Sequence, residues 1–311
     1  MEGAFALDCS DLKGRKLVNL DSEEEGVFTV SCAGGVRMDG FLPGTDAPLN
    51  GEAGYEIALE GLLGGHSGGE IHKGRASANQ VMGRVLYSAL ERFPGLRLAD
   101  IRGGKFDNVI CSRNHAKAAV PVDRAGEFEA FIREFDGALK NEYAGCDGGI
   151  TLSCEKTALD GALSPEATAN VLRTLLAVPQ GVQAMNVDFP GLVQTSLNMG
   201  VIEKKEDGIC FGVSVRSCIA TQKDMMVQRL KAILELGGGT FTLRGNYPGW
   251  QYDRNSTLRE AVLAAYQAVC GKEGTIEATH GGLECGLFID KLPGLDAVSF
   301  GPELHDVHSV K

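Results

Sequence analysis

The chain has 311 residues, of which 43% are apolar, and its formal net charge is −11 at pH 7. A chain of this length can bury one large core or two ordinary ones, and two domains is the expected organisation. The negative charge argues against a nucleic-acid groove or a surface for anionic membranes, because both need clustered Lys and Arg. We therefore expect chemistry on small molecules or peptides.

The cysteines and the N-terminal residues indicate the cellular compartment of the protein. The nine cysteines are an odd number, scattered along the chain without a Cys-x-x-Cys pair, which is typical of free thiols in a reducing environment. Residues 1–8 lack the basic start and apolar run of a signal peptide, and no stretch reaches the ~18 apolar residues of a membrane span. These features predict a cytoplasmic protein.

Two short apolar runs come first and predict buried strands. Residues 16–20 end at Asp21, and residues 28–32 are followed by Ala-Gly-Gly at 33–35, which we expect to break the strand. Ligands in α/β sheets gather at the carboxyl ends of strands, so Asp21 is a candidate cation ligand. The acidic residues 23–25 are more typical of a solvated loop.

A longer α+β segment is expected between residues 53 and 245, with alternating strand patterns and helical spacing of apolar residues. Its expected helices are 76–93, 127–139, 165–176 and 223–236, and its strands start near 55 and continue at 96–101, 115–120, 151–154, 193–199, 209–215 and 240–243. The order of elements recurs from 151–154 onward. This indicates either an internal duplication or a chance repeat.

Past residue 245 the alternation of the start returns. A helix at 256–269, a strand at 275–278 and a last strand at 296–300 are expected. The simplest architecture is one α/β domain, built from residues 1–52 and 246–311, which is interrupted by a second domain at residues 53–245.

A histidine among glycines is the first candidate functional group. In Gly-Gly-His-Ser-Gly-Gly at residues 64–69, the glycines let the backbone approach a ligand while His66 donates a hydrogen bond. The loop lacks the Lys and the Ser or Thr of a nucleotide-binding loop, which argues against a phosphate site. A tight strand-to-helix turn is the alternative.

Three further motifs follow strands. Arg216 could hold a carboxylate by two parallel hydrogen bonds, or make a surface ion pair. Residues 280–285 form a glycine loop that offers amides to an anion, or is a plain turn. His305 and His308 follow the last strand and could ligate a transition metal, although exposed loop histidines commonly have no such role.

Taken together and in order, these motifs resemble the Xaa-His dipeptidase branch of the M20 metallopeptidases. The blocks that carry the resemblance are residues 19–26, 32–35, 61–72, 247–250 and 282–288. The resemblance implies an α/β zinc-peptidase-like catalytic domain interrupted by an α+β lid or dimerisation domain. It also implies a homodimer that hydrolyses short peptides, of Xaa-His type and with broad specificity. The implied cofactor is Zn²⁺ in a two-metal site, with Mn²⁺ or Co²⁺ as alternatives.

The resemblance also assigns roles to individual residues. The assigned residues are Asp21 and His308 as metal ligands, His66 as the group that polarises the scissile carbonyl, and Asn108, Arg216, Gly281 and Gly282 as substrate-binding residues. One departure concerns Asn108, because the proline that usually follows this asparagine closely is absent.

A larger departure concerns the catalytic domain. The family's His-x-Asp motif, bridging aspartate and Glu-Glu pair all precede the segment that begins at Met1, so the resemblance implies a catalytic domain that lacks its N-terminal part. With two of five ligands, the isolated chain is expected to be inactive. The alternative function is a catalytically silent fragment that dimerises or binds peptide carboxylates. A third, weaker alternative is a thiol hydrolase that uses Cys111 or Cys285.

Overall fold

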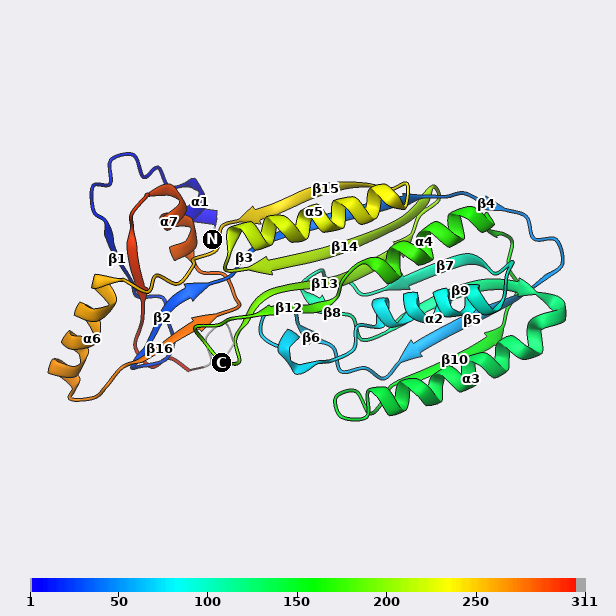
Figure 1. Cartoon of the computed structure of the whole chain (residues 1–311), viewed down its shortest axis with the longest axis horizontal. Helices are drawn as coiled ribbons and strands as arrows, with labels where there is room; N and C mark the ends of the chain where they lie inside the picture. The colour runs from blue at the N-terminus through cyan, green and yellow to red at the C-terminus, as the bar shows by residue number, and fades with distance from the viewer. Residues whose placement is uncertain (1, 306–311) are drawn as a thin grey trace.

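The protein is described by a computed structural model that covers residues 2–305. Two units lie end to end along the long axis of the molecule (Figure 1). The larger unit is built on a nine-stranded antiparallel sheet and the smaller unit on a four-stranded sheet. In the part of the chain that the structure describes, no helix is long and apolar enough to span a membrane.

The large sheet is antiparallel throughout. In spatial order its strands are β10 (Thr151–Lys156), β5 (Glu52–Glu60), β9 (Asn114–Pro121), β7 (Arg97–Gly103), β13 (Val193–Lys204), β14 (Gly208–Ser217), β3 (Gly34–Pro43) and β15 (Thr240–Tyr247), and β12 (Gly181–Met185) pairs with β13. Buried residues alternate with less buried ones along β3 and β5, as in a sheet with one covered face, whereas β13 and β14 in the middle are buried almost throughout.

The two halves of this sheet repeat one topology. Its helices are α2 (Ala78–Arg92), α3 (Ala125–Glu142), α4 (Pro165–Ala177) and α5 (Ala220–Leu236). The first half runs β5-α2-β7-β9-α3-β10, and the second runs β3-α4-β13-β14-α5-β15. Both are split βαβ units with the same spatial strand order, and they meet at β7 and β13. The strand at 151–154, expected to open the second copy, ends the first one instead.

The core of the large unit lies between the sheet and its helices. Tyr55, Ile57 and Leu59 alternate along β5 and are fully buried, while the intervening side chains face outward. Phe93 and Phe128 pack edge to face at 5.6 Å between ring centroids. Four helices lie along one face of the sheet (Figure 1), and the opposite face carries mostly polar and charged residues.

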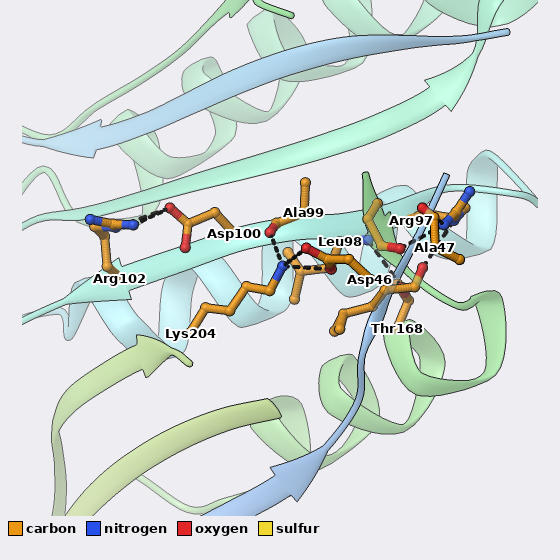
Figure 2. A network of polar contacts seen from close by, with 11 residues as sticks. Asp46, Ala47, Arg97, Leu98, Ala99, Asp100, Arg102, Thr168 and Lys204 are labelled. Atoms are coloured by element: carbon orange, nitrogen blue, oxygen red, sulfur yellow. Dashed lines mark hydrogen bonds and ion pairs between the residues drawn. The ribbon is translucent and has the colours of Figure 1, made fainter. Parts of the chain in front are cut away.

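A buried arginine holds two short strands to this sheet. Arg97, only 5% exposed, donates to main-chain carbonyls of β4 (Asp46–Ala47) and β11 (Ala162–Leu163) and their neighbours, as Figure 2 shows in part. Its five acceptors are Leu163 O at 2.9 Å, Ala162 O at 2.6 Å, Ala47 O at 2.7 Å, Pro48 O at 2.9 Å and Glu52 Oε1 at 3.3 Å. All five N–H groups of this guanidinium are therefore matched.

The small unit has a mixed sheet. Its strands are β1 (Lys16–Asn19), β17 (Asp296–Ser299), β2 (Val27–Cys32) and β16 (Thr275–Thr279), and its helices are α1 (Glu2–Ala6), α6 (Thr257–Cys270) and α7 (Glu284–Lys291). β1 pairs with β17 in parallel, so the carboxyl ends of these strands are neighbours. Cys32, Trp250 and Cys285 lie in one of its buried clusters.

The expected strand break after Cys32 is confirmed, because β2 ends at Cys32 and Ala33 lies in no strand. The sequence analysis missed the long strand β3, which begins at Gly34 and Gly35 and pairs with β14 and β15. The glycines are needed because the backbone of Gly249 and the ring of Tyr247 occupy the space that side chains would take. The two sheets consequently divide near residues 33 and 247. The division into a catalytic part at residues 1–52 and 246–311 and a lid at residues 53–245 stays a prediction.

Candidate functional site

The site lies where the chain passes between the two sheets. Cys32 and Trp250 exchange backbone hydrogen bonds of 3.0 and 2.9 Å, which ties the two crossing segments together. Ala33 N donates to Gly281 O at 2.9 Å, so the loop after β16 joins them. The short antiparallel pair of β6 (Gly65–His66) and β8 (Val109–Ile110) lies at the end of the large unit nearer the small one (Figure 1).

His66 is fixed by the glycines that follow it. Its Nδ1 accepts from the backbone N–H groups of Gly68 at 3.3 Å and Gly69 at 3.1 Å. Since Nδ1 is the acceptor, the proton of the neutral ring belongs on Nε2, which can donate to a ligand. Burial, and secondly the charge of Arg216, lower the pKa of His66. The imidazole is therefore neutral at pH 7 and suited to polarising a carbonyl.

Glu70 holds the histidine loop in shape. Its carboxylate accepts from His66 N at 2.9 Å and from Lys73 Nζ at 2.9 Å, and lies 3.2 Å from Arg75 Nη1. The hydrogen bonds from Lys73 and from the His66 backbone lower the pKa of Glu70 to about 2. Glu70 thus stays charged over the whole physiological range.

Arg216 lies directly beside His66. A Cβ at Gly68 would come within 2.9 Å of His66 Cε1 and 3.4 Å of Arg216 Cζ, so both groups line one small space. Arg216 Nη1 donates to Tyr247 Oη at 3.3 Å, and its buried Nε has no partner. Among residues 2–305, no carboxylate lies within ion-pair distance of this guanidinium. Its charge is therefore available to an anionic ligand.

His280 is a buried histidine at this place, whereas His66 is exposed, and His280 was not among the predicted site residues. Its Nε2 lies 2.7 Å from Ser196 Oγ, and its buried Nδ1 has no partner. Burial, followed by the charge of Arg216, lowers its pKa to about 4. The one signal in the sequence is its position between a strand and a double glycine.

The pairing of β6 with β8 brings Asn108 close to His66. Its carbonyl accepts from Ser67 N at 2.9 Å, next to the paired residues His66 and Val109. Asn198 of β13 donates to Asp107 O at 2.8 Å and to Val109 O at 2.9 Å, which fixes this turn. Nothing in the sequence of a strand interior marked Asn198 for this role.

The glycine loop provides less than expected. Gly281 N donates to Thr279 Oγ1 at 3.1 Å, and its carbonyl accepts from Ala33. The Gly281 amide is therefore occupied within the chain and is not free for an anion. The predicted substrate-binding roles of Gly281 and Gly282 both stay predictions.

Of the two predicted metal ligands, the structure describes only Asp21, which lies in the small unit. Asp21 is exposed, two residues beyond β1, beside the loop that follows β17, and Ser22 Oγ lies 2.9 Å from Ser299 Oγ. His308 lies outside the described residues. Within residues 2–305, no three His, Cys, Asp or Glu side chains gather as a possible metal site.

The two proposed thiol nucleophiles are unsuited to that role. Cys111 and Cys285 are buried, and burial raises the pKa of both thiols, that of Cys285 to about 12. A nucleophilic cysteine needs a lowered pKa and an accessible sulfur. The thiol-hydrolase alternative is therefore not supported.

Comparison with known proteins identifies the large unit. Residues 57–146 match the family model described as the peptidase dimerisation domain of M20 peptidases. This segment of the chain is similar to an M20 peptidase dimerisation domain. The chain is also 37% identical, over 311 residues, to the cytosol non-specific dipeptidase of Escherichia coli (strain K12), a match that spans 99% of the chain and 64% of that protein.

A solved structure matches the whole M20-type fold. The aminoacylhistidine dipeptidase of Vibrio alginolyticus superimposes with a TM-score of 0.93 at 34% identity, over 99% of this chain and 63% of that one. The expected mixed α/β fold and the resemblance to this dipeptidase branch are thereby confirmed. The chain spans less than two thirds of the length of both relatives.

Proposed function

We propose that this chain binds short peptides by their free C-terminal carboxylate at the space between His66 and Arg216, as part of an M20-type dipeptidase. The observation that carries the proposal is a concentration of unpaired polar atoms. Among residues 2–305, Ser67 Oγ, Arg216 Nε and His280 Nδ1 are buried without a hydrogen-bond partner. Buried polar atoms are rarely left unpaired, so two such atoms near a guanidinium that itself has an unpaired Nε indicate a site built for a polar ligand.

The arrangement fits a dipeptide chemically. The guanidinium of Arg216 can donate to a carboxylate, a charge-assisted bond stronger than a neutral one. The Nε2–H of neutral His66 can donate to the peptide carbonyl, and this bond strengthens as negative charge develops on that oxygen. Asn108 completes the proposed set as a further hydrogen-bonding side chain, and its backbone bond to Ser67, next to His66, supports this assignment.

A metal site is implied for this chain by its resemblance to the family. Resemblance assigns Zn²⁺, with Mn²⁺ or Co²⁺ as alternatives, to ligands that include Asp21 and His308. The described residues do not fit a complete metal site, because no three candidate ligands gather among them. We therefore assign no hydrolytic step through a metal to these residues. Hydrolysis of dipeptides by metal-activated water is proposed only for the complete enzyme.

Assembly and location are also proposals. A homodimer is supported by the match of residues 57–146 to a dimerisation domain. A cytoplasmic location is supported by the name of the Escherichia coli relative and by nine free cysteines. Short peptides are the proposed substrates, and neither nucleic acid nor membrane is a proposed partner.

Calorimetric titration of the purified chain with Ala-His tests the binding function. We expect saturable binding in the wild type and a loss of about 100-fold in affinity for Arg216→Ala, since truncating one partner of a charged pair costs about 2–5 kcal/mol. Arg102→Ala is the matched control, because Arg102 is a 67% exposed arginine that pairs with Asp100 on the sheet surface. Equal affinities of the three proteins would overturn the proposal.

The same samples separate the two functions that the sequence leaves open. Hydrolysis of Ala-His with added zinc or manganese that stops with a chelator would favour a complete peptidase. Binding without hydrolysis would favour the peptide-binding function.

A further inference from the structure

Three residues form a row across neighbouring strands beside the site. Arg216 of β14 pairs with Gly35 of β3, and Gly35 pairs on its other side with Tyr247 of β15. Directly opposite residues of antiparallel strands point to the same face of a sheet. Arg216 and Tyr247 therefore face the same side, two strands apart, with a glycine between them.

A bulge brings Tyr247 into this row. The register of β15 on β3 passes from Arg244 opposite Arg37 to Tyr247 opposite Gly35, so three steps on one strand match two on the other. Gly245 has φ +57, a left-handed conformation that glycine adopts without strain. An extra residue of this kind re-aims the side chain that follows it.

A buried lysine fixes the bulge. Lys223 of α5, which is 6% exposed, donates from Nζ to Asn246 Oδ1 at 2.7 Å and to Tyr247 O at 2.8 Å. Both acceptors belong to the bulged segment. The main chain at Tyr247 is thus held in place independently of the phenol.

The missing side chain of Gly35 makes room for the ring. A Cβ there would lie 2.7 Å from Tyr247 Oη and 2.8 Å from Tyr247 Cε1, closer than real Cβ contacts. The ring consequently crosses the empty position, and its hydroxyl reaches Arg216 Nη1 at 3.3 Å. A phenol can orient a guanidinium without neutralising it, whereas a carboxylate would compete with an anionic ligand.

We propose that Tyr247 is a positioning residue that holds the Arg216 guanidinium in its ligand-binding orientation, and that Gly35 and the bulge at Gly245 serve this contact. The nature of the ligand rests on the proposed function, but the positioning of Arg216 does not. This gives the Tyr-Pro-Gly-Trp segment at residues 247–250 a role beyond tying the two crossing segments together.

Titration of His66 by NMR, without ligand, tests the positioning directly. Arg216 lies beside His66 and its charge contributes to the lowered pKa, so any movement of the guanidinium changes that pKa. Tyr247→Phe is expected to raise the pKa of His66 by a few tenths of a unit, and Arg216→Ala sets the upper limit of the change. Tyr252→Phe is the control, since Tyr252 packs on Arg259 at 5.1 Å, away from His66.

Binding of Ala-His and of its C-terminal amide gives the second readout. Tyr247→Phe is expected to weaken the acid about tenfold and to leave the amide unchanged, since an oriented charge-assisted bond is lost. Gly35→Ala should reproduce both effects with the phenol present, and if it fails to fold, Tyr247→Phe decides. An unshifted His66 pKa in Tyr247→Phe would overturn the positioning role. If the wild type fails to bind Ala-His, the proposed function fails, and the His66 titration still decides on the positioning.

Discussion

Two arginines of the large unit have opposite surroundings. Arg97 is buried and donates all its N–H groups to five acceptors, four of which are main-chain carbonyls. Arg216 has one long bond, to a phenol, and leaves a buried Nε without a partner. Arg97 thus has all its hydrogen-bond donors paired within the fold, whereas Arg216 does not among residues 2–305. The difference indicates that the first stabilises the structure and the second is kept for a ligand.

The comparison predicts that Arg97→Ala is the most damaging of the changes considered. Its removal leaves several buried carbonyls unpaired, and we expect the free energy of unfolding in urea to fall by about 3–5 kcal/mol. Arg102→Ala, at the exposed end of the same strand, should cost less than about 0.5 kcal/mol. A loss below about 1 kcal/mol for Arg97→Ala would show that a saturated arginine is not a stabilising one.

A second prediction concerns how the free energy of unfolding depends on pH through His280, which lies near Arg216. The pKa of His280 falls from 6.5 to about 4 on folding, so the unfolded chain binds more protons below pH 6.5. The free energy of unfolding should therefore drop by about 3 kcal/mol as the pH is lowered from 6.5 to 4. His280→Gln keeps a partner for Ser196 and should flatten this slope in urea titrations at several pH values. An unchanged slope would mean that His280 is not buried as a neutral ring.

The third prediction is that removal of Arg216, unlike removal of Arg97, has little effect on stability. Arg216→Ala should change the free energy of unfolding by less than about 1 kcal/mol, because few bonds are lost and an unpaired donor is removed. Chemical denaturation measures this directly, and Ala-His titration of the same protein should reveal the lost affinity. A destabilisation as large as that of Arg97→Ala would contradict the division between the two arginines.

The smallest effect is expected at the edge of the site. Glu70→Gln weakens the bonds to His66 N and to Lys73, and it should lower affinity for Ala-His by about two- to fivefold, since one charge-assisted bond becomes neutral. Lys140, which pairs with Asp136 on α3, offers a control as Lys140→Gln. An affinity equal to that of the control would remove Glu70 from the site.

Sequence patterns predicted most of the fold for a clear physical reason. Helices and strands with alternating or helical apolar spacing, such as α2 and β5, are dictated by local periodicity. The break after Cys32 was predicted correctly, but strand β3, which starts at Gly34, was missed because glycine usually marks a turn. Its glycines fit a strand only because distant residues, Gly249 and Tyr247, take the space of their side chains, which local sequence does not encode.

Only part of the site was predicted, because local motifs do not encode contacts between distant residues. His66, Asn108 and Arg216 were found through motifs and do lie in one region of the structure. His280 and Asn198 were missed, because their roles depend on contacts across about 80 to 90 residues of sequence. Such contacts are fixed by the order of strands, which spacing within a motif does not indicate.

The ratio of affinities for Ala-His and its C-terminal amide, measured on the wild-type chain, tests the central claim most directly. If Arg216 is the unsaturated partner of a peptide carboxylate, the acid should bind about 100-fold more tightly than the amide, and the difference should vanish in Arg216→Ala. Equal binding of acid and amide by the wild type would contradict the account, because the guanidinium would then have no carboxylate to recognise.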